Sequence, residues 1–198
     1  MPLKAHLLVL GRGCFMDYEV LMKASLKGHP ERIKHTLGVR NRALELGKLY
    51  HANLEVLDIA SLLHDITKYW TDSKQVEYIN DATIIDNIHP AMYHSVSAYL
   101  YAKSLGVTNP LILEAIRYHM WGKIDMSLET MILSVSDYCE ENRTHEPAKK
   151  VYELALKDLT HAYLYMVEST IQYLKNENIE PHIDQIKTYN YYLKKGVE

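Results

Sequence analysis

The chain lacks the cysteine pairs on which disulfide frameworks and zinc knuckles depend. Its 198 residues include two cysteines, Cys14 and Cys139, which lie far apart and form no C-x-x-C motif. Small secreted domains are often rich in cysteine, whereas proteins of the reducing cytoplasm keep few cysteines and leave them unpaired. The cysteine content therefore predicts a cytoplasmic location.

Long apolar runs and a strong charge of either sign are also missing. A membrane-spanning helix needs about 20 mostly apolar residues, and no run in this chain approaches that length. The run from Leu7 to Leu10 is also too short for the core of a signal peptide. A formal net charge of −3 and a pI near 6.4 give no broad attraction to nucleic acid or anionic membranes. We therefore expect neither of these as a partner.

Strand patterns are absent as well. No segment of any length alternates apolar and polar residues, and apolar residues instead recur at spacings of three and four. The length suits one well-buried domain, and the fold class we expect is all-α, a single helical bundle. The predicted helices span residues 17–27, 31–50, 56–65, 73–80, 90–105, 111–119, 128–141, 148–175 and 183–194, with a polar connection at 81–89.

The first fifteen residues match no periodic pattern. We expect residues 1–15 to be an extension, from a tag or an upstream start, and assign the domain to residues 16–198.

Histidine is abundant, and one of the eleven histidines follows a buried helix beside a carboxylate. The apolar run from Val56 to Leu63 continues directly into His64 and Asp65. Adjacent helical side chains point about 100° apart, so these two cannot both face solvent while the run is buried. A buried carboxylate beside an imidazole is unfavourable unless something pairs with it, and a divalent metal would pair with both. The alternative is an ordinary helix end with a solvated Asp65.

Further ligand-type residues lie on or near the inward faces of the other predicted helices. The candidate metal ligands are His35, His64, Asp65, His94, His119 and Asp137. Four imidazoles and two carboxylates suit iron, manganese, cobalt, nickel or zinc, and are wrong for calcium. Six ligands exceed what one catalytic metal with open positions needs. The set therefore favours two metal ions, with Asp65 as the natural bridge.

The order His, His-Asp, His, His, Asp resembles that of the HD-domain phosphohydrolases, and longer blocks resemble the YqeK-like family within them. These are bacterial symmetrical diadenosine tetraphosphate hydrolases. The blocks are Arg32 to Val39, Leu62 to Lys68, Ala115 to His119, and Asp137-Tyr138 with Asn142-Arg143, and the resemblance covers about residues 20–193. It implies a helical HD-domain bundle with a dinuclear, iron-containing site held by the six candidates. The implied reaction splits diadenosine tetraphosphate into two molecules of ADP.

The implied chemistry fits the charged residues near these motifs. Phosphoryl transfer requires that the phosphate charges be neutralised and the attacking oxygen be held in line, and two metal ions about 3.5–4 Å apart serve both needs. We expect Asp65 and Lys68 to be catalytic, and Lys68 and Arg143 to bind phosphate oxygens. The expected partner is a dinucleoside polyphosphate or another nucleotide, and a homodimer is compatible with the sequence.

Three places depart from the family pattern, and one of them is Glu141, which stands where a proline is usual before Asn142 and Arg143. After His119 the family has small hydroxyl residues, a glycine and an arginine, where this chain has Met120, Trp121, Gly122 and Lys123. We expect Trp121 to stack on a base and Lys123 to bind substrate. Pro90 to His94 fits the family's sequence before its fourth histidine, but the spacing from His94 to Gly106 is one residue short. His89 is therefore the rival of His94 as a ligand, and we favour His94.

Other functions stay open at this point. The same metal chemistry would serve another HD-type nucleotide phosphohydrolase, such as a nucleotidase or a guanosine tetraphosphate hydrolase. A nucleotide-binding HD domain without catalysis would be expected to lack a ligand, and none of the six is missing here.

Overall fold

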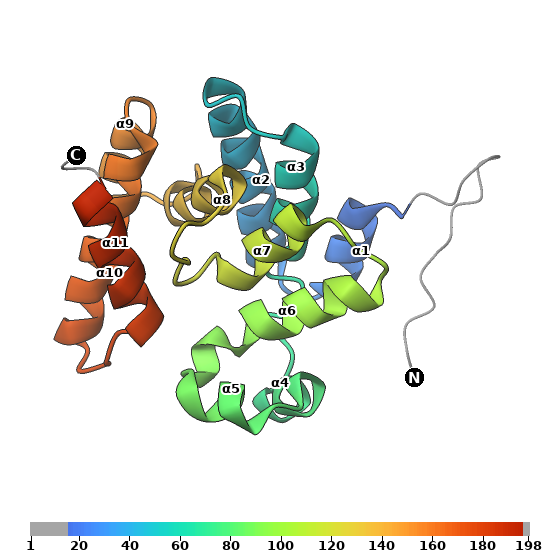
Figure 1. The fold of residues 1–198 in the computed structure, drawn as a ribbon. Helices are drawn as coiled ribbons and strands as arrows, with labels where there is room; N and C mark the ends of the chain where they lie inside the picture. Colours follow the sequence, from blue (N-terminus) through green and yellow to red (C-terminus); the bar gives the residue numbers. More distant parts are fainter. Residues whose placement is uncertain (1–15, 196–198) are drawn as a thin grey trace.

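The computed structural model describes residues 16–195, and in this range the chain forms helices and no strand (Figure 1). This confirms the expected all-α fold. The helices are α1 (Tyr18–Ser25), α2 (Pro30–Leu49), α3 (Leu54–Leu63), α4 (Asp72–Ile79), α5 (Ala82–Asn87), the 3-10 helix η1 (Pro90–Met92), α6 (Tyr93–Ser104), α7 (Pro110–Tyr118), α8 (Leu128–Cys139), α9 (Glu146–Ala155), α10 (Leu159–Asn176) and α11 (Ile183–Lys195). Residues 1–15, which we expect to be an extension, lie outside the described range.

Short polar side chains and prolines determine where several helices begin. Asp17, Asn53 and Ser127 accept hydrogen bonds from backbone N–H groups in the first turns of α1, α3 and α8. Those N–H groups have no partner within the helix, so the caps stabilise its start. Pro30 and Pro110 are the first residues of α2 and α7, where a missing N–H is harmless.

Four helices, α2, α3, α7 and α8, form the centre of the bundle. Helix α2 packs on α3 and α8, and α7 packs on α3, α6 and α8. Helices α9 and α10 contact α8, and α11 contacts α10, so these three lie on one side of the centre, whereas α1 contacts α3 on the opposite side (Figure 1). The ends of α3 and α7 therefore meet α2, α6 and α8 in the middle of the molecule.

The hydrophobic core extends over both sides of this centre. One apolar cluster includes Leu46 of α2 and Val151 of α9, and a second includes Val39, Leu63 and Ile116 from α2, α3 and α7. All five side chains are fully buried. Burying an apolar side chain of this size contributes about 1.5–3 kcal/mol, so the helices that carry the candidate ligands are held firmly.

The segment expected as a polar connection at 81–89 contains a helix, α5. The Asp81 side chain accepts a hydrogen bond from the Ile84 N–H group at 3.3 Å. Ile84 and Ile85 pack against the apolar cluster that contains Trp121. A helix of six residues is unstable alone, so this packing, which no local pattern reveals, decides its formation.

The long helix expected at 148–175 is divided into α9 and α10. Asp158 adopts an extended backbone, with φ −152°, and its carboxylate accepts a hydrogen bond from the His161 N–H group at 2.9 Å. The apolar spacing continues across this break, and neither glycine nor proline marks it. The helix expected from Pro90 also differs, because η1 comes first and α6 begins at Tyr93. His94 therefore lies in the first turn of α6 rather than in a second turn.

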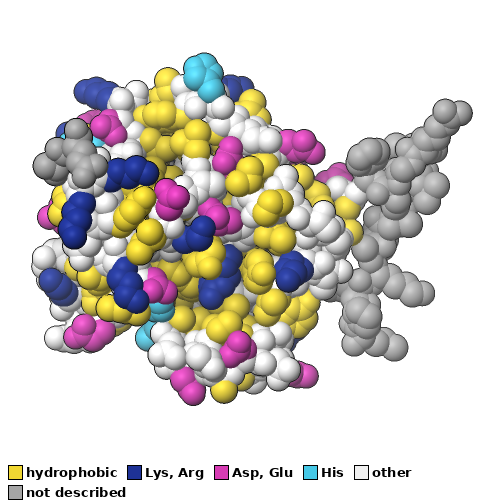
Figure 2. Space-filling view, in the orientation of Figure 1, with side chains coloured by type: hydrophobic (Ala, Val, Ile, Leu, Met, Phe, Trp, Pro, Cys, Tyr) yellow, Lys and Arg dark blue, Asp and Glu magenta, His cyan; other side chains and the backbone are white. Residues whose placement is uncertain are grey.

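The surface has no region dominated by one sign of charge on the face drawn in Figure 2, where acidic and basic side chains are interspersed. This agrees with the small net charge of −3. None of the helices within the described residues has the length and apolar character required to cross a membrane.

Candidate metal centre

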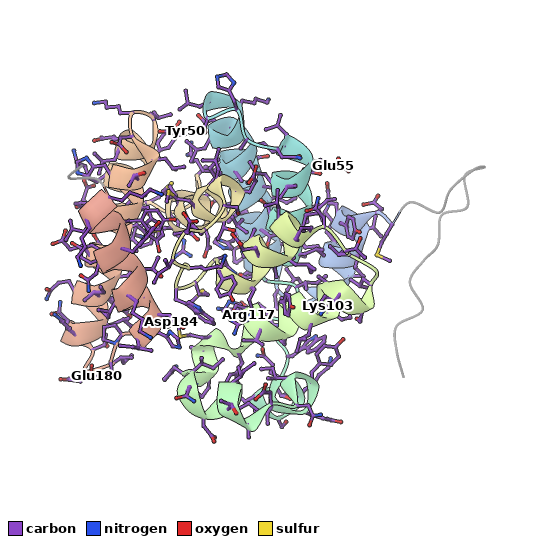
Figure 3. The ribbon with its side chains drawn as sticks, viewed as in Figure 1. Tyr50, Glu55, Lys103, Arg117, Glu180 and Asp184 are labelled. Atoms are coloured by element: carbon purple, nitrogen blue, oxygen red, sulfur yellow. The ribbon has the colours of Figure 1, made fainter. Side chains whose placement is uncertain are left out.

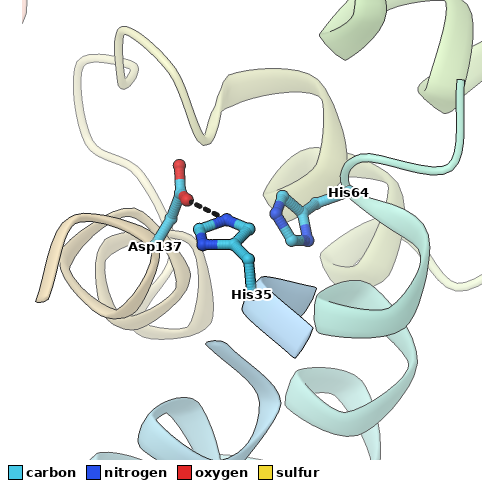
Figure 4. Close-up of side chains that lie close together, drawn as sticks. All are labelled: His35, His64 and Asp137. Atoms are coloured by element: carbon cyan, nitrogen blue, oxygen red, sulfur yellow. Dashed lines mark ion pairs between the residues drawn. The ribbon is translucent and has the colours of Figure 1, made fainter. Parts of the chain in front are cut away.

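Six side chains from five helices or helix ends converge between α2, α3, α6, α7 and α8. They form two groups, and in each group the potential ligand atoms lie within 4.8 Å of one another. The first group is His35, His64 and Asp137, drawn in Figure 4, and the second is Asp65, His94 and His119. The structure thus brings together all six residues that the sequence singles out.

Asp65 lies between the two groups, with one carboxylate oxygen toward each. Its Oδ2 atom is 3.5 Å from His64 Nε2 and 4.0 Å from His35 Nε2. Its Oδ1 atom is 3.2 Å from His94 Nε2. A carboxylate placed in this way can contact two cations at once.

Backbone carbonyls fix the orientation of three of the imidazoles. The Nδ1 atoms of His64, His94 and His119 lie 2.6, 2.9 and 2.8 Å from the carbonyl oxygens three residues before each of them. A carbonyl oxygen only accepts, so each Nδ1 carries the proton and each Nε2 keeps its lone pair. In His94 this lone pair lies 3.3 Å from Lys68 Nζ. The Nε2 atoms therefore face the centre of the cluster as potential ligands.

Two of the inward nitrogen atoms have no hydrogen-bond partner among the described residues. They are Nε2 of His64 and His119, and both are buried. Leaving a buried polar atom unsatisfied costs about 1–3 kcal/mol, and two such atoms directed at one place need a common partner. A metal ion satisfies lone pairs of this kind, so the residues fit a metal centre.

His35 is held from a second side by a residue that the sequence analysis missed. The Nδ1 atom of His35 lies 3.2 Å from Glu140 Oε1, and Glu140 is only 2% exposed. Gly38 allows this approach, because a Cβ atom at that position would collide with the Glu140 carboxylate. Metal-binding histidines often donate their second N–H to a carboxylate in this way. The sequence signal that could have identified Glu140 is its spacing from Asp137. It follows Asp137 by three residues, and this spacing puts two side chains on one face of a helix.

Electrostatics keep the carboxylates ionised and two of the imidazoles neutral. Burial raises the pKa of Asp65, but the nearby His64, His94 and Lys68 outweigh it and hold that pKa well below its usual value. Burial lowers the pKa of His94 to about 3 and that of His119 to about 4. Both rings are therefore neutral at pH 7, as ligation requires.

His35 behaves differently from these two imidazoles. Burial lowers its pKa, but the hydrogen bond and charge of Asp137 outweigh this and raise the pKa above its usual value. The His35 Nε2 atom is 3.0 Å from Asp137 Oδ1, the contact that is dashed in Figure 4. The surrounding carboxylates thus favour a positive charge at this nitrogen atom, and either a proton or a metal ion supplies one.

Three basic side chains border the cluster. Lys68 Nζ lies 3.3 Å from His94 Nε2, the ring nitrogen that keeps its lone pair, and burial lowers the lysine pKa although Asp65 opposes that effect. Arg143 Nη2 is 3.8 Å from Asp137 Oδ1. Arg32 Nη1 is 2.8 Å from Asp65 Oδ2, a contact that the sequence analysis missed although Arg32 belongs to the first motif block. Together these cations create a positive border suited to phosphate oxygens.

A cavity of about 620 Å³ opens beside the cluster, between α8, α10 and the loop before α9. His119, Asp137 and Arg143 border it on the side of the cluster, and Tyr138 and Tyr173 line it farther away. Ligand cavities in proteins typically measure about 300–1,000 Å³, so this one has the size for a nucleoside.

Trp121 and Lys123 are not positioned as the sequence analysis expected. Trp121 is 2% exposed, its ring stacks on His182 with centroids 5.0 Å apart, and the Arg117 guanidinium lies 4.9 Å from the ring. In Figure 3, Arg117 points toward the start of α11, where Asp184 lies. The indole ring thus has no face open to a base. Lys123 pairs with Glu114 at 3.0 Å and does not line the cavity.

His89 and His94 are clearly separated by their surroundings. His89 is exposed, and its Nδ1 atom accepts a hydrogen bond from the Ala91 N–H group at 3.2 Å. His94 is 1% exposed and belongs to the cluster.

Comparisons with known proteins agree with this geometry. Residues 32–142 match the HD domain family model, a range that contains all six candidate ligands. The symmetrical bis(5′-nucleosyl)-tetraphosphatase of Bacillus subtilis is 33% identical over 86% of this chain and 92% of its own length, and that of Halalkalibacterium halodurans is 30% identical over the same shares. A structure from Clostridium acetobutylicum, described as a predicted HD superfamily hydrolase involved in NAD metabolism, matches with a TM-score of 0.84. It is 26% identical and covers 93% of this chain and all of that one.

Proposed function

The chain belongs to the HD-domain family of hydrolases, and on that premise we propose that it splits diadenosine tetraphosphate symmetrically into two molecules of ADP. The observation that carries the proposal is the position of Asp65 between two groups of ligand-type side chains, in which the buried Nε2 atoms of His64 and His119 have no hydrogen-bond partner. The relatives named for symmetrical cleavage cover most of this chain, which supports the choice of substrate.

We infer that His35, His64 and Asp137 hold one metal ion, that His94 and His119 hold a second, and that Asp65 contacts both. Such a metal pair, when bound, activates water and neutralises phosphoryl charge. Four imidazoles and two carboxylates suit iron, manganese, cobalt, nickel or zinc, and iron is our first candidate. A carboxylate shared by two cations also reduces their mutual repulsion.

The basic side chains bind the negatively charged phosphate chain of the substrate. Lys68 and Arg32 lie beside Asp65 and His94, and Arg143 lies beside Asp137, so together they border the cluster on more than one side. Their positive charge stabilises the negative oxygens during phosphoryl transfer. None of them needs to donate a proton, because the leaving group is itself a phosphate.

One nucleoside would occupy the cavity beside Asp137 and His119. The aromatic rings of Tyr138 and Tyr173 supply surfaces on which a purine can stack, and the apolar Met166 borders the same space. A cytoplasmic location is part of the proposal, since Cys139 is a free, buried thiol.

Product analysis by anion-exchange chromatography tests the proposal. Purified protein is incubated with diadenosine tetraphosphate, with and without added iron, manganese or cobalt. We expect ADP as the only nucleotide product, and we expect its formation to depend on metal. ATP with AMP would mean that water attacks a different phosphorus atom. In a parallel incubation with AMP, release of adenosine and inorganic phosphate would instead identify a nucleotidase if diadenosine tetraphosphate is left intact.

A further inference from the structure

The second nucleoside of the proposed substrate requires a surface of its own, and this inference rests on the proposed function. A symmetrical cut leaves one nucleoside and two phosphates on each side of the broken bond. The cavity beside Asp137 has room for one of these halves. The other half must extend from the metal centre in a different direction.

An aromatic surface lies on the other side of the metal centre from that cavity. The cavity is bordered by α8, α10 and α11. Tyr69 instead lies in the segment after α3, and His29 lies in the connection between α1 and α2. In Figure 1, α10 and α11 lie on one side of the central helices and α1 lies on the other. The segments that carry Tyr69 and His29 are therefore well placed for the second half of the substrate.

The Tyr69 ring is supported from one face and accessible from elsewhere. His29 stacks on it with ring centroids 3.5 Å apart and an interplanar angle of 4°. Tyr69 is nevertheless 48% exposed, although His29 covers one face of its ring. An aromatic ring held flat by a second ring, with its other face free, is a suitable platform for a nucleobase.

Basic side chains connect this platform to the metal centre. Arg32 Nη1 contacts Asp65 Oδ2 at 2.8 Å, and the Arg32 side chain also lies beside Tyr69. Lys68 precedes Tyr69 in the chain and lies against the His94 ring. A phosphate chain that leaves the metal centre on this side would meet two cations and then the aromatic ring.

We propose that Tyr69, supported by His29, stacks on the base of the second nucleoside, and that Arg32 and Lys68 bind the phosphates between this base and the metal centre. The platform would thus distinguish a dinucleoside polyphosphate from a mononucleotide. Stacking selects a flat base without reading its hydrogen-bonding edge, so this half of the substrate should tolerate either purine.

The test compares two substrates in the metal-loaded protein: diadenosine tetraphosphate, and adenosine 5′-tetraphosphate, which lacks the second nucleoside. If adenosine 5′-tetraphosphate is not hydrolysed, we measure its inhibition constant for diadenosine tetraphosphate hydrolysis in place of a KM. The variants are Tyr69→Ala, Tyr69→Phe, Tyr173→Ala and Tyr78→Ala. Tyr173 is an exposed tyrosine of the cavity. Tyr78 is an exposed tyrosine of α4 that packs edge-on against Trp70 and belongs neither to the cavity nor to the stacked pair of Tyr69 and His29. Metal content and thermal unfolding are measured for each variant.

We expect Tyr69→Ala to raise the KM for diadenosine tetraphosphate about tenfold, as loss of a base–aromatic stack does, and to leave the constant for adenosine tetraphosphate unchanged. Tyr69→Phe keeps the ring and should resemble the wild type. Tyr173→Ala should weaken the binding of both substrates, and Tyr78→Ala should change the binding of neither.

Three results would overturn the inference alone: an equal effect of Tyr69→Ala on both substrates, no effect on either, or a loss with Tyr69→Phe as large as with Tyr69→Ala. The last would assign the effect to the hydroxyl contact with Arg32 rather than to stacking. A wild-type protein that leaves diadenosine tetraphosphate intact would defeat the proposed function, and this inference with it.

Discussion

Glu140 and Asp137 hold opposite sides of one imidazole. His35 Nδ1 lies 3.2 Å from Glu140 Oε1, and His35 Nε2 lies 3.0 Å from Asp137 Oδ1. The Asn142 N–H group donates to Glu140 Oε2 at 2.7 Å and so fixes the carboxylate. The orientation of a proposed ligand on α2 thus depends on a residue at the end of α8.

We expect Glu140→Gln to weaken metal binding about 10- to 100-fold, because loss of such an outer carboxylate usually has an effect of this size. The amide keeps the shape of the side chain but removes the charge that makes His35 a better ligand. Titration of the metal-free protein with Mn²⁺ would measure the change. Glu141→Gln is the matched control, since Glu141 is exposed and adjacent. Equal affinities for the Glu140 and Glu141 variants would contradict the role assigned to Glu140.

Asp65→Ala should abolish metal binding and hydrolysis together, because Asp65 faces both groups of imidazoles and its charge offsets that of both cations. Metal analysis of the purified variant, beside its rate of ADP formation, would test this. Asp58→Ala removes a carboxylate from α3, the helix that precedes Asp65, where Asp58 pairs with Arg40, and it should keep the metal. Full metal occupancy in Asp65→Ala would show that Asp65 is not a shared ligand.

Much of the metal centre could be predicted from the sequence because its signals are local. The apolar period of α3 leads directly into His64 and Asp65, and the order of the ligand residues along the chain needs no knowledge of packing. The same holds for helix starts at caps such as Ser127. These features depend on neighbours within one or two turns.

The rest depends on contacts between segments that are distant in the sequence. Glu140 turns inward because Gly38, about a hundred residues earlier, leaves room for it. Trp121 follows α7, and its burial depends on His182 at the start of the last helix. Asp158 divides a continuous amphipathic pattern by capping α10, although an aspartate in that pattern could equally face solvent. No single-sequence pattern distinguishes these outcomes.

Lys68→Ala should leave the metal content unchanged and lower kcat about 10- to 100-fold, because Lys68 borders the cluster as a cation but is not itself a ligand. Metal analysis and steady-state kinetics with diadenosine tetraphosphate would separate the two effects. Lys74→Ala is the control, since Lys74 is a residue of α4 whose ammonium group lies over the Trp70 ring. A variant of Lys68 that loses metal would indicate that the lysine stabilises the ligand His94 rather than the phosphate chain.

Glu114→Gln should destabilise the fold in a way that depends on pH. Burial raises the pKa of Glu114, but hydrogen bonds from the Ser127 N–H group, Lys123 and Thr130 outweigh it and lower that pKa. A carboxylate with a lowered pKa contributes its stability above the unfolded-state value, and this contribution is lost as pH falls through the folded-state value. We expect a loss of about 1–2 kcal/mol at pH 7, measured by urea unfolding.

The difference between wild type and Glu114→Gln should shrink as the pH is lowered below 4.5, the ordinary pKa of a glutamate. Glu168→Gln, at an exposed position on α10, should show neither the loss nor its pH dependence. Glu114 Oε1 accepts from the Ser127 N–H group at 2.7 Å, so the charge also lies at the start of α8, where the helix dipole favours an anion. A difference that stays constant down to pH 3.5 would mean that shape, and not charge, accounts for the contribution of Glu114.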